Sequence, residues 1–171
     1  VKGSLRVLNG TIKLVLIAAA CILNSACSTI STSDPSIDFR NEMKALVGEI
    51  TSTARAEIPS FNVVVNNGEE LVTRNGTSSS AIDPTYRDQI DGFLIESVFY
   101  GYSGINTITP VLQRNTMLPY LIKLRNSGID VMVIDYCSDS QFVADSLLRN
   151  HELGFLAFPA PRRELDTIPG N

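Results

Sequence analysis

The chain has 171 residues, of which 44% are hydrophobic and 19% charged, and this composition is typical of one ordinary globular domain. Its formal net charge is −4, but residues 1–26 contain three basic residues and no acidic one, so 11 basic residues face 18 acidic ones in the rest of the chain. An acidic domain argues against nucleic acid as a partner, because phosphate binding needs clustered Lys and Arg.

The N-terminus has the pattern of an export signal. Three basic residues accompany an apolar run at residues 12–23, which is too short to span a bilayer, and small residues follow up to Cys27. Residues 1–26 are therefore predicted to be a signal peptide of the lipoprotein type, with cleavage before Cys27 and acylation of its thiol. This predicts an exported protein, anchored to a bacterial membrane in the cell envelope. The alternative is a plain cleaved signal in which Cys27 has no role.

A polar Ser/Thr tether at residues 27–36 then separates the anchor from a predicted domain at 37–171. If Cys27 is acylated, Cys137 is the only remaining cysteine, so no internal disulfide is expected. The single histidine, His151, and one spare cysteine make no ligand cluster, and we expect neither a metal nor another cofactor.

Helices and strands alternate along this domain. Apolar residues at helical spacing predict helices, and short apolar or β-branched runs predict strands. The predicted order is helix 39–54, strand 61–65, a loop at 73–88, strand 90–95, helix 110–126, strand 129–134, helix 138–150 and strand 154–158.

The strands are nearly continuous apolar runs, as expected of parallel strands buried on both faces. The alternation predicts an α/β fold with a parallel sheet. No glycine-rich phosphate-binding motif follows any strand, which argues against a nucleotide-binding fold. A (β/α)₈ barrel of the TIM type takes about 250 residues, so these four strands predict half a barrel. Its open edges would invite self-association.

Ligands of parallel α/β folds bind at the carboxyl ends of the strands, and all four predicted strands end in polar groups. Glu96 follows an apolar strand and precedes aromatic residues, surroundings that suit a general acid; the alternative is a solvated residue at the start of a loop. Asp135 could bind a sugar hydroxyl or orient a partner, or it could cap the helix at 138–150.

Three other residues at these ends are candidate substrate contacts. Asn67 could bond substrate hydroxyls or simply form the turn before Gly68, while Tyr100 and Tyr136 could stack on sugars or pack in the core. Asp91 lies inside a strand, and we expect it to form a structural salt bridge.

The segments FNVVVNNGEEL, IDGFLIESVFYG, IDVMVIDYC and GFLAFPAPRRELDTIP follow one another in this order. Together they resemble the C-terminal half of glycoside hydrolase family 114, the endo-α-1,4-polygalactosaminidase family, over residues 35–169. The resemblance implies the second half of a TIM-type barrel and hydrolysis of galactosamine-containing polysaccharide by carboxylate acid/base catalysis, without a cofactor. It places Glu96 at a catalytic position and adds Glu69 and Arg162 as substrate-binding residues.

The second catalytic carboxylate of that family lies on an earlier strand, in the half that the resemblance does not cover. Asp135 is the substitute that this chain offers. Two functions therefore stay open: an exported polysaccharide hydrolase, and an inactive half-barrel lipoprotein that acts as a binding or structural module. A second carboxylate beside Glu96 would distinguish them, because glycoside hydrolysis usually needs a pair.

Overall fold

The computed structural model describes residues 15–18 and 38–166. The predicted cleavage site, Cys27 and the tether at 27–36 lie outside the described residues. The elements in chain order are β1 (Val15–Ala18), α1 (Phe39–Glu57), β2 (Val63–Asn66), the 3₁₀ helix η1 (Glu69–Val72), α2 (Pro84–Arg87), β3 (Gly92–Glu96), α3 (Val111–Asn126), β4 (Asp130–Tyr136), α4 (Ser140–Glu152) and β5 (Leu156–Ala160).

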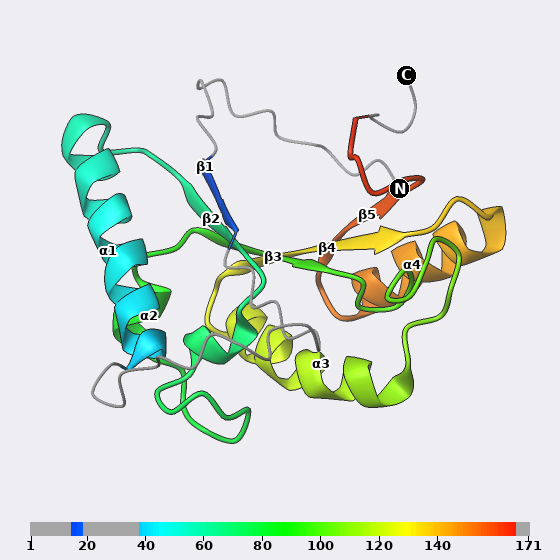
Figure 1. Ribbon diagram of the computed structural model, residues 1–171, viewed down its shortest axis with the longest axis horizontal. Helices are drawn as coiled ribbons and strands as arrows, with labels where there is room; N and C mark the ends of the chain where they lie inside the picture. The colour runs from blue at the N-terminus through cyan, green and yellow to red at the C-terminus, as the bar shows by residue number, and fades with distance from the viewer. Residues whose placement is uncertain (1–14, 19–37, 167–171) are drawn as a thin grey trace, which may run out of the picture.

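The four predicted strands form a parallel sheet in the order β2-β3-β4-β5, so the predicted parallel α/β fold is confirmed. The short strand β1 runs parallel to β2 and lies within the stretch predicted as a signal peptide. The helices lie along one side of the sheet in Figure 1. Strand order and parallel direction bring the carboxyl ends of β2 to β5 to one edge.

Aspartate side chains begin three of the helices. Asp38 accepts hydrogen bonds from two backbone N–H groups of α1, and Asp83 and Asp139 do the same for α2 and α4. The cap of α4 is thus Asp139, and the alternative reading of Asp135 as this cap is wrong. The loop predicted at 73–88 contains α2 and an isolated β-bridge between Thr73 and Ile82.

The two faces of the sheet bury different residues. Side chains from alternate strand positions, such as Phe93, Ile95 and Val133, pack with Leu121 and Leu124 of α3 in the main core. The other positions form a smaller cluster in which Leu94 and Phe158 pack against Ile134, Tyr136 and Ala160. We call this second surface the helix-free face, because no helix within residues 38–166 covers it (Figure 1).

Asp91 forms the structural salt bridge expected of it. Its Oδ2 lies 2.8 Å from Nη2 of Arg55 and accepts a hydrogen bond of 2.6 Å from the backbone N–H of Val63. The contact ties α1 to the start of β2.

None of the helices in the described part of the chain has both the length and the hydropathy of a membrane-spanning segment.

Candidate active site around Glu96

Glu96 is the last residue of β3, and its half-buried side chain lies on the helix-free face. Each carboxylate oxygen accepts one hydrogen bond from a neighbouring strand. Nδ2 of Asn66 donates to Oε1 over 3.1 Å, and the hydroxyl of Tyr136 donates to Oε2 over 2.8 Å. Residues from three adjacent strands therefore fix one carboxylate at the carboxyl end of the sheet.

Strand register explains this grouping. Asn66 pairs with Leu94 and Glu96 pairs with Ile134. Because side chains alternate between the faces of a strand, Asn66, Glu96 and Tyr136 all fall on the helix-free face. The three residues need no loop to bring them together.

The chain leaves β3 abruptly after Glu96. Ser97 has a positive φ of 64°, and its backbone N–H donates to the carbonyl of Ile134 over 2.7 Å. The backbone N–H of Glu96 itself donates to Oδ1 of Asn67 over 3.3 Å. Asn67 therefore supports the backbone of the site, and its φ of 59° suits the turn that precedes Gly68.

The Tyr136 phenol keeps its proton and so can donate the hydrogen bond to Glu96. Burial, together with the neighbouring Glu96 carboxylate, raises the pKa of its phenol well above the usual value. The guanidinium of Arg163 lies 4.5 Å from the centre of the Tyr136 ring and also donates to the carbonyl of Gly101. A cation thus lies over the ring whose hydroxyl binds Glu96.

Asn66 has an unused acceptor. Its side chain is only 8% exposed, and its Oδ1 is buried without a hydrogen-bond partner in the structure. Buried polar atoms normally have partners, so an orphaned acceptor beside a carboxylate is a place where a ligand donor would be satisfied.

The structure does not bring Asp135 to Glu96. Asp135 is fully buried on the opposite, helix-covered face. Its Oδ1 accepts from the backbone N–H groups of Phe99 (2.9 Å) and Tyr100 (3.2 Å). Its Oδ2 accepts from the hydroxyl of Ser146 (2.7 Å) and Nδ2 of Asn150 (3.3 Å). These four donors make Asp135 a structural link between the loop after β3 and α4.

Tyr100 also faces the helices. Its ring stacks on Phe142 with 4.9 Å between the ring centres, and its hydroxyl donates to Oδ2 of Asp145 over 2.6 Å. Burial and the Asp145 carboxylate raise the pKa of Tyr100 to about 12. The geometry favours the packing role of Tyr100 over sugar stacking.

The two residues suggested by the family resemblance differ in their surroundings. Glu69 begins η1 just after the turn at the end of β2, and burial raises the pKa of its half-buried carboxyl. Arg162 is exposed and its Nη1 lies 3.4 Å from Oδ2 of Asp166. The structure shows no contact of either side chain with Glu96.

Two residues of the site were missed by the sequence analysis. Asn67 was selected where Asn66 carries the contact with Glu96, and Arg162 was selected where Arg163 lies over Tyr136. The alternation of side chains along β2 was a signal for Asn66, since Asn66 ends the strand in phase with Val64. For Arg163, adjacency to Arg162 was the only hint.

The Glu96 carboxylate can take part in acid/base chemistry. Within residues 38–166, no three or more His, Cys, Asp or Glu side chains are grouped so that they could hold a metal ion. Each Glu96 oxygen accepts one bond and keeps a free lone pair, so the group can exchange a proton with a ligand.

Neither of two comparisons with known proteins adds a relative to these observations. No model of a protein family matches the chain. No curated protein matches it either.

Proposed function

We propose that this chain is an exported glycoside hydrolase-like protein, similar to family 114, whose Glu96 acts as an acid/base on galactosamine-containing polysaccharide. The observation that carries the proposal is the placement of Glu96: a half-buried carboxylate at the carboxyl end of a central parallel strand, held by Asn66 and Tyr136. Active sites of parallel barrels lie at this end of their strands. We further propose that the sheet is the second half of such a barrel.

The site chemistry suits a sugar. The orphaned Oδ1 of Asn66 can accept a bond from a hydroxyl or amino group, and the Tyr136 hydroxyl holds the Glu96 carboxylate in one orientation. Fixed orientation matters because general acid/base transfer needs heavy-atom distances of about 2.6–3.2 Å to the reacting group.

The proposal requires a second carboxylate. Retaining glycosidases place the two carboxyl groups about 5 Å apart and inverting ones about 6.5–9.5 Å apart. Asp135 points to the other face of the sheet and already accepts four hydrogen bonds. Asp135 therefore does not supply this group, and a residue outside the described part of the chain or a second chain would supply it.

The test is hydrolysis of a galactosamine-rich polymer, followed by the release of reducing ends. Glu96→Gln should lower turnover by about 10²–10⁴-fold, because general acid/base catalysis typically contributes that much. Asp130→Asn, an exposed residue at the start of β4 and so at the opposite end of the sheet from Glu96, is the matched control and should keep full turnover. Equal turnover of the Glu96→Gln and wild-type chains would exclude this site assignment.

A second function is a binding or structural module without catalysis, carried by an envelope lipoprotein. The observation that favours it is that Asp135, the expected second carboxylate, is bonded on the other face of the sheet and not beside Glu96. In this case, the chain would bind galactosamine oligomers without cleaving them. Calorimetry would then detect binding that weakens in Glu96→Gln while no reducing ends are released by either chain.

A further inference from the structure

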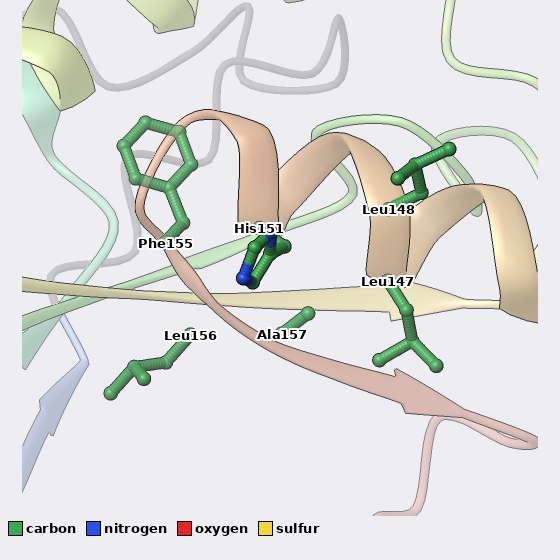
Figure 2. Close-up of a pocket in the computed structure, with 6 residues that line it drawn as sticks. All are labelled: Leu147, Leu148, His151, Phe155, Leu156 and Ala157. Carbon is green, nitrogen blue, oxygen red and sulfur yellow. The ribbon is translucent and has the colours of Figure 1, made fainter. Parts of the chain in front are cut away.

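The α4–β5 end of the sheet carries an open apolar groove of about 430 Å³. Figure 2 shows the residues of α4 and β5, and of the turn between them, that line this groove. Leu147, Leu148 and Leu156 are 45%, 56% and 58% exposed, which is unusual for leucines that lie together. The groove is lined by Leu147, Leu148, His151, Phe155, Leu156 and Ala157, of which His151 is the only titratable residue.

A second groove of about 430 Å³ lies on α1, which leads into β2 at the opposite end of the strand order from β5. It is lined by Leu46, Glu49, Ile50, Thr53 and Ala54, and Glu49 is the only titratable residue among them. Leu46 is 45% exposed. These residues recur every three or four positions and so form one stripe along the helix.

The exposed charged residues of α1 are acidic, because its basic side chains bind other parts of the chain. Lys44 is paired with Asp83, Arg55 is paired with Asp91, and Arg40 donates to backbone carbonyls of residues 73 and 74. The exposed charged residues of the helix are then the glutamates at positions 42, 49 and 57. The α1 groove therefore presents a carboxylate where the α4–β5 groove presents a histidine.

The sheet edges beside these grooves can also pair. Within the described residues β5 pairs with β4 alone, so its outer edge is open. The edge of β2 pairs with β1, whose residues lie in the predicted signal peptide. Cleavage before Cys27 would remove β1 and leave the edge of β2 free as well. Both edge strands would then have unpaired backbone groups that a strand of another chain could bind.

We propose that the neighbour is a second copy of this chain: the α4–β5 groove of each copy packs on the α1 groove of the other. A two-fold axis makes the two contacts identical and closes the assembly, as such an arrangement requires. Strands β2 to β5 of two copies give the eight strands of a barrel. The next step rests on the proposed function. The second copy places its own Glu96 at the same carboxyl end of the barrel and so supplies the missing carboxylate.

The first test measures association, independently of any activity. The exported chain should sediment as a dimer at about 100 μM and dissociate on dilution. Leu148→Asp and Leu46→Lys, both at exposed positions, should each leave a folded monomer by circular dichroism. An equimolar mixture of the two variants should restore the dimer. In the mixed dimer one contact joins two unchanged grooves, and the other brings the Leu148→Asp side chain of one copy against the Leu46→Lys side chain of the other. A monomeric wild type at this concentration, or a mixture that stays monomeric, would overturn the proposal.

The second test concerns the shared site. If each site needs the Glu96 of both copies, an equimolar mixture of wild type and Glu96→Gln keeps about one quarter of its dimers active under random pairing. Independent sites would keep about one half of the activity. Association without any turnover would refute the catalytic function but leave the dimer established, so the two failures can be told apart.

Discussion

The buried carboxylate of Asp135 gives the sharpest prediction for stability. Asp135→Ala removes the acceptor of four donors at once: two backbone N–H groups in the loop after β3 and two side chains of α4. The hydroxyl of Ser146 can turn to another acceptor, whereas the N–H groups of Phe99 and Tyr100 cannot. Each buried donor left without a partner costs about 1–3 kcal/mol.

Two orphaned N–H groups alone therefore predict a loss of about 2–6 kcal/mol for Asp135→Ala, a large part of the about 5–15 kcal/mol that stabilises a typical domain. Asp135→Asn should cost less, about 1–2 kcal/mol, because one amide oxygen can still accept from the loop. The new Nδ2 would then face α4, where the orphaned Oδ1 of Asn150 could accept from it after an amide flip.

Urea unfolding followed by circular dichroism measures these differences as shifts of the midpoint at constant slope. Asp130→Ala is the matched control, since Asp130 is an exposed residue at the start of the same strand and its loss should change stability by no more than about 0.5 kcal/mol. A cost below about 1 kcal/mol for Asp135→Ala would refute the reasoning.

Four further predictions concern one glycine, two tyrosines and the N-terminus. Gly101→Ala should destabilise the fold by about 2 kcal/mol or more in urea unfolding, because φ is 103° and the new Cβ would lie 2.5 Å from Cβ of Tyr136. Tyr136→Phe should cost about 1 kcal/mol in the same assay through loss of one buried hydrogen bond, and should also reduce turnover. The hydrogen bond from Tyr100 is the main cause that lowers the pKa of Asp145, so stability should be lost as the pH falls below about 4, and Tyr100→Phe should flatten this loss in acid titrations of unfolding. Mass spectrometry of the exported chain should find an acylated N-terminus at Cys27; a free N-terminus elsewhere would refute lipidation.

The order and direction of β2 to β5 could be predicted because each of these strands is a short apolar run bounded by polar residues, whereas β1 lies in a stretch predicted as a signal peptide. The side of the sheet on which a residue lies was harder to predict. Asp135 and Tyr136 are neighbours in the sequence and are both candidates for the site, yet their side chains lie on opposite faces of the sheet. Alternation along the strand separates them, and the register of Glu96 with Ile134 predicts that Tyr136 joins Glu96.

Other contacts of the site could not be obtained from local patterns. The direction of Tyr100 depends on the position of Asp145 and Phe142 on α4, which is fixed only when the helix packs on the sheet. The contact between Arg163 and Tyr136 depends on how the chain turns after β5. Both contacts join elements whose relative placement is a tertiary property, and neither has a sequence signature.

The bonds that hold the segment after Glu96 also determine how it moves. The amide hydrogens of Ser97, Phe99 and Tyr100 are bonded to the carbonyl of Ile134 and to Oδ1 of Asp135, although these residues lie outside any helix or strand. Their hydrogen exchange should therefore be as slow as that of the central strands. A loop protected to this degree cannot serve as a lid over the site, so a ligand would reach Glu96 through motion of another segment or with no gate.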